Sequence, residues 1–130
     1  MSQEDHFHLG VKALIQNGEG EILILQVDPK KFAVHSAIYW DLPGGRIQKN
    51  ESLEDALRRE VEEELGWDHI TIIQPFCMAL TPRRLVYPDR DVGLILSIYK
   101  CEASKMPISL SEEHVNFQWA APTLAAECLA

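Results

Sequence analysis

The 130-residue sequence predicts an α/β protein in which a mixed β-sheet lies between helices, an α/β/α sandwich. Residues 7–16 alternate between polar and apolar side chains, as a strand with one buried face does. Residues 22–27 and 92–99 are nearly continuous apolar runs, which are typical of strands covered on both faces. Residues 53–65 are rich in strong helix formers. Together these patterns predict helices on both sides of one sheet.

The remaining elements are shorter. Asn17-Gly18-Glu19-Gly20 predicts a hairpin turn after the first strand. Further strands are predicted at 38–42, 69–74, 76–80 and 115–120, with Pro75 dividing the middle two, and a last helix at 123–129. Residues 81–91 contain two prolines and three arginines, and we predict an exposed loop there.

Length and composition predict one domain over residues 1–130, in the cytoplasm. The polar N-terminus does not resemble a signal peptide, and no apolar run is long enough to span a membrane. The cysteines Cys77, Cys101 and Cys128 are scattered and odd in number, which predicts free thiols in a reducing compartment. The sequence predicts no oligomeric state.

The net charge of −8 is concentrated in one segment. Residues 51–64 hold seven acidic and two basic residues, a net charge of −5, which leaves −3 for the rest. This distribution argues against a nucleic-acid-binding surface and for a local cation site.

The segment begins and ends with helix signals. Ser52 is a good N-cap, and Gly66 can end the helix in a left-handed conformation. At the 3.6-residue period of a helix, one apolar stripe is formed by Leu53, Leu57, Val61 and Leu65. The helix is therefore expected to dock on the core.

Three glutamates interrupt this pattern. Glu60 and Glu64 are one turn apart on the sector of the apolar stripe, and Glu63 lies beside them. Such carboxylates repel each other and lose hydration, a conflict that a divalent cation removes. Oxygen ligands of this kind suit Mg²⁺ or Mn²⁺. The plain alternative is a solvated acidic face.

At these residues the sequence resembles a known family. Gly45, five residues, Glu51, seven residues and then Arg59-Glu60-Val61-Glu62-Glu63-Glu64-Leu65-Gly66-Trp67 resemble the complete signature of the Nudix hydrolases. Leu42-Pro43-Gly44 is similar to the usual lead-in. The resemblance implies a catalytic loop–helix–loop at 45–67 in the family's sandwich fold. It also implies hydrolysis of a diphosphate linkage in a nucleoside diphosphate derivative, with Mg²⁺ or Mn²⁺.

The resemblance also implies roles for single residues. The metal ligands would be Glu60, Glu63, Glu64 and the Gly44 carbonyl. Glu60 would be the general base, as in one branch of the family; other branches use a loop acid, which here would be Glu112 or Glu113. Glu51 and Arg59 would form a structural ion pair, and Gly45 and Gly66 would be structural.

Substrate contacts are harder to predict. Arg46, Arg83 and Arg84 suit phosphate, and Tyr87 could stack on a base, although a solvated loop is an equal alternative. Within the Nudix family, a proline about fifteen residues after the signature resembles a feature of ADP-ribose hydrolases, and Pro82 lies at that position. The expected partner is a small-molecule nucleotide such as a nucleoside triphosphate, ADP-ribose or a dinucleoside polyphosphate. Two other hypotheses are a catalytically silent Nudix domain that binds a nucleotide, and an acidic interaction protein without metal chemistry.

The histidines near the N-terminus and in the first long loop carry little signal. His6 and His8 share one strand face and could bind a metal together, or be merely exposed. For His35 we predict no partner.

Overall fold

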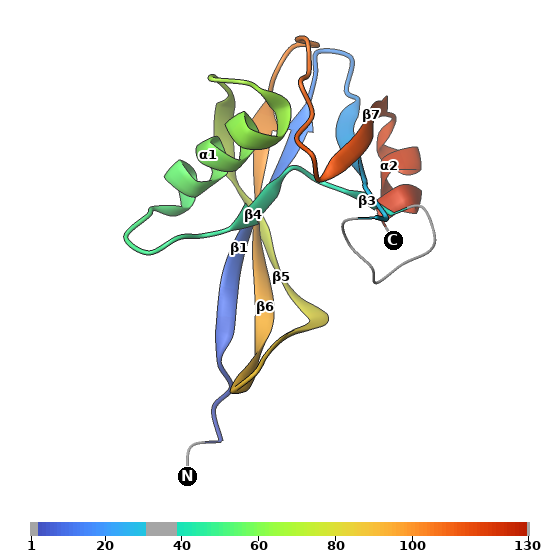
Figure 1. Cartoon of the computed structure of the whole chain (residues 1–130). Coiled ribbons are helices and arrows are strands. Elements are labelled where there is room, and N and C mark those ends of the chain that lie inside the picture. The colour runs from blue at the N-terminus through green and yellow to red at the C-terminus, as the bar shows by residue number, and fades with distance from the viewer. Residues whose placement is uncertain (1–2, 31–38, 130) are drawn as a thin grey trace.

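The computed structural model describes residues 3–30 and 39–129, so His35 lies outside the described residues. Figure 1 shows the arrangement of the elements. In chain order they are β1 (Phe7–Gln16), β2 (Ile22–Val27), β3 (Trp40–Asp41), β4 (Gly44–Arg46), α1 (Leu53–Leu65), β5 (Thr71–Tyr87), β6 (Arg90–Glu102), β7 (His114–Ala120) and α2 (Pro122–Leu129).

The strands form one mixed, seven-stranded sheet, as the sequence predicts. Its main path is β3-β2-β1-β6-β5, while β4 pairs with β1 and β7 pairs with β2. β1 and β6 are parallel along their length, from Phe7 opposite Gly93 to Gln16 opposite Glu102. The other pairs are antiparallel. β1 pairs with β2 only at its end, which leaves room for β4 beside its middle.

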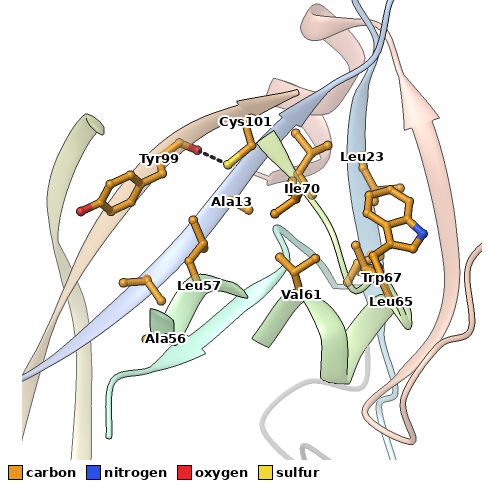
Figure 2. Packing of buried hydrophobic residues seen from close by; sticks show 13 residues of the cluster. Ala13, Leu23, Ala56, Leu57, Val61, Leu65, Trp67, Ile70, Tyr99 and Cys101 are labelled. Atoms are coloured by element: carbon orange, nitrogen blue, oxygen red, sulfur yellow. Dashed lines mark hydrogen bonds between the residues drawn. The ribbon is translucent and has the colours of Figure 1, made fainter. Parts of the chain in front are cut away.

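The two faces of the sheet are covered by different helices. In β1, Val11, Ala13 and Ile15 belong to the core under α1, whereas Leu14 packs against the cluster that contains Ala125 of α2. Figure 2 shows the first cluster, to which α1 contributes its four buried apolar side chains: Ala56, Leu57, Val61 and Leu65. Burying a leucine-sized side chain stabilises the fold by roughly 1.5–3 kcal/mol. The predicted sandwich is therefore confirmed.

Helix α1 begins and ends as predicted. The Ser52 hydroxyl accepts a hydrogen bond of 3.1 Å from the Asp55 amide. Gly66 has φ 76° and donates from its amide to the Glu62 carbonyl oxygen. The helix therefore ends in the left-handed conformation that glycine adopts without steric cost.

The prediction of an exposed loop at residues 81–91 is wrong. Residues 81–87 continue β5, and only Pro88 and Asp89 form a turn before β6. Nor does Pro75 divide two strands, because it lies within β5 opposite Tyr99. β5 is at the edge of the sheet, where a proline removes no ladder hydrogen bond if its nitrogen faces outward.

Smaller differences concern strand ends. Residues 69–70 precede β5 rather than belonging to it, and the strand predicted at 38–42 is described only as Trp40–Asp41. The glycine turn after it becomes the short strand β4. No helix in the described part of the chain is long and apolar enough to cross a membrane.

The edge strand β5 exposes large apolar side chains, including Phe76, Met78 and Leu80. Residues 71–82 contain no charged residue. Leu80 lies opposite Ile95, which in turn lies opposite Leu9, so an apolar row crosses three strands.

Candidate active site

A cleft of about 1150 Å³ lies where β1, β4 and α1 meet the β5–β6 hairpin and the segment before β7. Its acidic lining residues are Asp41, Glu60, Glu63, Glu64, Glu112 and Glu113, and its arginines are Arg46, Arg83 and Arg84. The structure thus brings the predicted metal ligands and the predicted phosphate contacts to the same cleft.

Glu64 is the most deeply buried of these acids, with a side chain 5% exposed. Its Oε1 accepts a hydrogen bond of 2.7 Å from the Gly44 amide. Burial raises the pKa of Glu64 to about 8, although the Gly44 hydrogen bond and the charge of Lys12 oppose the shift. Lys12 is itself bonded to Asp41 at 2.8 Å. Among the described residues, no lysine or arginine therefore forms an ion pair with the Glu64 carboxylate.

Gly44 can make this contact only as glycine. Its φ is 149°, and a Cβ would collide with the Val11 carbonyl oxygen and approach Lys12. The absence of a side chain lets β4 lie directly against β1.

Glu60 lies against the next glycine. A Cβ on Gly45 would collide with the Glu60 carboxylate, whose side chain is 16% exposed. Arg59 Nη1 donates to Glu60 Oε1 at 2.9 Å. Burial nevertheless raises the pKa of Glu60, because it outweighs the opposing effect of Arg59.

The Arg59 guanidinium joins the loop to the helix. Its Nε and Nη2 donate to the two Glu51 oxygens at 2.7 and 3.1 Å, and Nη2 also donates to the Arg46 carbonyl oxygen at 3.1 Å. The hydrogen bond from Arg59 is the main cause that lowers the pKa of Glu51. This two-pronged geometry fixes the guanidinium plane, which a lysine could not do.

The other predicted acids are more exposed. The Glu63 side chain is 58% exposed and lies 3.4 Å from Arg59, and Glu112 and Glu113 are also exposed. Within residues 3–30 and 39–129, no set of three His, Cys, Asp or Glu side chains already converges as metal ligands. Side-chain rotation, chiefly of Glu60 and Glu63 away from Arg59, would be needed to gather them.

His114 is a site residue that the sequence analysis missed. It is buried, lines the cleft, and places Nε2 3.4 Å from Glu64 Oε2. Burial lowers the pKa of His114. A single histidine at the start of a predicted strand carries no spacing signal; only the neighbouring Glu112 and Glu113 hinted at a site there.

A second cluster joins β4 to the β5–β6 hairpin. Arg46 Nη1 donates to the Tyr87 hydroxyl at 2.9 Å. The Arg90 guanidinium lies over the Tyr87 ring, 5.0 Å from its centroid. The centroid of the His8 ring is 5.9 Å from the centroid of the Tyr87 ring. Tyr87 is therefore already occupied by protein groups.

The neighbouring arginines Arg83 and Arg84 differ in their contacts. Arg84 pairs with Asp5 at 2.6 Å and with Asp91 at 3.1 Å. For Arg83 the described residues provide no carboxylate within ion-pair distance. Arg83 is thus the arginine of this pair that is available to an anion in the cleft.

A capped helix that presents glutamates to a cleft also lined by arginines is suited to the hydrolysis of phosphate anhydrides. A sequence model described as the NUDIX domain matches residues 6–129. The chain therefore belongs to the Nudix family, and it is a hydrolase that cleaves diphosphate linkages. Members of this family generally use divalent metal ions.

Known relatives agree with this assignment. The chain is 32% identical over 114 residues to nucleoside triphosphatase NudI of Escherichia fergusonii, covering 84% of this chain and 78% of that protein. The structure of a MutT protein from Methanosarcina mazei Go1 matches with TM-score 0.70 and 29% identity, over 99% of this chain and 88% of that one. The E. coli dihydroneopterin triphosphate pyrophosphohydrolase matches with TM-score 0.74 over 95% and 88%; at 19% identity it supports the fold alone.

Proposed function

We propose that this protein hydrolyses nucleoside triphosphates with Mg²⁺ or Mn²⁺ bound by the glutamates of α1. The observation that carries the proposal is Glu64, whose carboxyl is 5% exposed and is paired with no lysine or arginine in the part of the chain that the structure describes. A buried carboxylate of this kind is the hard oxygen donor that these ions take. The NudI relative, named as a nucleoside triphosphatase, supports the substrate class.

We assign the metal ligands to Glu60, Glu63, Glu64 and the Gly44 carbonyl oxygen. Glu64 would be the fixed ligand, because the Gly44 amide already orients it at 2.7 Å. Glu60 and Glu63 would leave Arg59, which remains bonded to Glu51 through Nε and Nη2. A divalent cation held there would neutralise phosphate oxygens and make a coordinated water more acidic.

Glu60 would accept the proton from the attacking water. A general base works best when its pKa lies near the working pH, and burial raises the pKa of Glu60 toward that range. Glu112 and Glu113 line the same cleft and are the competing candidates. Because Glu60→Gln would also remove a proposed metal ligand, Glu112→Gln and Glu113→Gln decide between them. If kcat stays near the wild-type value in both variants, Glu60 is the base, whereas a large fall in one of them assigns the base to that loop acid.

Arg83 would bind the substrate phosphates. It lines the cleft and has no carboxylate partner among the described residues, whereas Arg84 is held by Asp5 and Asp91. Arg46 would bind phosphate while Tyr87 holds it in place. In this arrangement Tyr87 positions an arginine rather than stacking on the base.

A substrate panel tests the proposal. Nucleoside triphosphates, ADP-ribose and a dinucleoside tetraphosphate would be incubated with Mg²⁺ or Mn²⁺, and the products identified by chromatography. We expect kcat/KM for triphosphates to exceed the others at least tenfold. A preference for ADP-ribose, or tight binding by calorimetry without turnover, would contradict it.

The setting of the enzyme belongs to the same proposal. Residues 1–130 would form a single Nudix domain, which is supported by the one continuous sheet. A cytoplasmic location is supported by the three cysteines, which are all free thiols.

A further inference from the structure

The carboxylate of Glu64 is contacted at both oxygens. Oε1 accepts the hydrogen bond from the Gly44 amide at 2.7 Å, and Oε2 lies 3.4 Å from His114 Nε2. The side chains of Glu64 and His114 are each 5% exposed. Bulk water therefore cannot easily replace either contact.

Packing does not explain why a histidine is at position 114. Its Nδ1 is buried and has no hydrogen-bond partner among the described residues. An unsatisfied buried nitrogen destabilises a fold, and an apolar side chain of similar volume would avoid that penalty. The contact with Glu64 is the feature that an apolar side chain would lose.

The contact also ties the acidic loop to the helix. His114 begins β7 directly after the segment 111–113, and the Ser111 amide donates to the Glu64 carbonyl oxygen at 3.3 Å. Two contacts from residues 111–114 thus reach Glu64, which lies in the last turn of α1. The charges of Glu113, Asp41 and Lys12 act on the imidazole.

We propose that His114 is a positioning residue that holds Glu64 in the orientation needed to ligate a divalent cation. With Gly44 on one oxygen and His114 on the other, the carboxylate plane is fixed and its remaining lone pairs are directed by the protein. Nε2 carries a proton in the imidazolium and in one neutral tautomer, so a small approach from 3.4 Å would let it donate to Oε2. This inference rests on the proposed metal site at Glu64.

Metal binding without substrate tests it. Mn²⁺ affinity would be measured by electron paramagnetic resonance, and melting temperature would be measured in EDTA, for wild type, His114→Leu and His114→Gln. We expect His114→Leu to weaken Mn²⁺ binding about 10-fold or more, as loss of a residue behind a metal ligand usually does. In EDTA its melting temperature should equal or exceed that of wild type, because the orphaned Nδ1 is gone. His114→Gln, which keeps an N–H donor, should recover most of the affinity.

The matched control is the neighbouring exposed Val115→Thr, which should bind Mn²⁺ like wild type. The inference is overturned if His114→Leu binds Mn²⁺ as tightly as wild type while Glu64→Gln does not. It is also overturned if His114→Leu melts well below wild type in EDTA, which would mark a structural role, or if His114→Gln binds as weakly as His114→Leu. If Glu64→Gln itself retains wild-type affinity, the proposed metal site fails first.

Discussion

Gly45 and Glu60 lie so close together that a single methyl group on Gly45 would collide with the Glu60 carboxylate. The colliding atoms are the end of a flexible side chain, so Glu60 can move away without disturbing the backbone. The position of the proposed base is thus set by the absence of a side chain fifteen residues earlier.

Gly45→Ala should therefore reduce catalysis much more than stability. We expect kcat to fall at least about 10-fold, because a displacement of about 1 Å in a catalytic group can cost up to 100-fold. The melting temperature should change by only a few degrees. Gly18→Ala is the control, since a Cβ there meets nothing within 4 Å. Normal turnover of Gly45→Ala would show that the placement of Glu60 is not needed.

Glu64→Gln should abolish most activity and leave the fold intact. The glutamine oxygen can still accept from the Gly44 amide, but it lacks the charge that binds a cation. We expect turnover to fall by about 100-fold or more, because changes behind a metal ligand already cost 10–100-fold. The rise in melting temperature that Mg²⁺ gives to wild type should also disappear. Turnover near the wild-type value at saturating Mg²⁺ would exclude Glu64 as a ligand.

The stability of the metal-free protein should depend on pH through Glu64. Below pH 4.5 its carboxyl is protonated in both the folded and unfolded states. Between pH 4.5 and about 8 the unfolded chain loses this proton while the folded protein keeps it, so the contribution of Glu64 to stability is lost as pH rises. Denaturant unfolding in EDTA at pH 5 and pH 8 measures this loss.

Glu64→Gln supplies the reference for that experiment. Wild type should lose more stability than Glu64→Gln between the two pH values, by on the order of 3 kcal/mol. The lowered pKa values of Asp5 and Glu51 are present in both proteins, so their effects cancel when the pH dependence of Glu64→Gln is subtracted from that of wild type. Equal pH dependence would mean that the folded protein does not hold Glu64 in its protonated form.

Arg83 and Arg84 form a matched pair for testing substrate binding. Arg83→Ala should raise KM for a nucleoside triphosphate roughly 10-fold, because a hydrogen bond to a charged group is worth about 1.5–3 kcal/mol. Arg84→Ala should leave KM within about twofold and lower the melting temperature slightly, since Arg84 holds Asp5 against the hairpin. Steady-state kinetics gives KM for both variants, and thermal melting gives their melting temperatures. The reverse pattern would assign the phosphate contact to Arg84.

The parts of the fold that depend on local sequence could be predicted. The N-cap, the apolar stripe and the C-cap of helix α1 all lie within residues 52–66, so the local sequence predicts all three. The strand at 81–87 could not be predicted, because Pro82 and the two arginines that follow it suggest a loop. It is held by β6, with Arg84 opposite Gly93 and Tyr87 opposite Arg90. Such cross-strand pairs have no signature in a single sequence.

The same distinction applies to the site. The glutamates of α1 could be predicted, since helical spacing places them together. The contact between Glu64 and His114 joins positions fifty residues apart, and that of Arg46 with Tyr87 joins positions forty-one apart. Both contacts join separate elements that only the tertiary fold brings to one cleft.

The uncharged edge strand has a consequence for handling the protein. Edge strands invite pairing with other chains, and charged side chains usually discourage it, but residues 71–82 have none. The six residues between Pro75 and Pro82 all have a backbone N–H, and the N–H groups among them that face away from β6 could pair with another chain. Aggregation after partial denaturation would therefore start from this short window, and the overall charge of −8, carried elsewhere, would do little to prevent it.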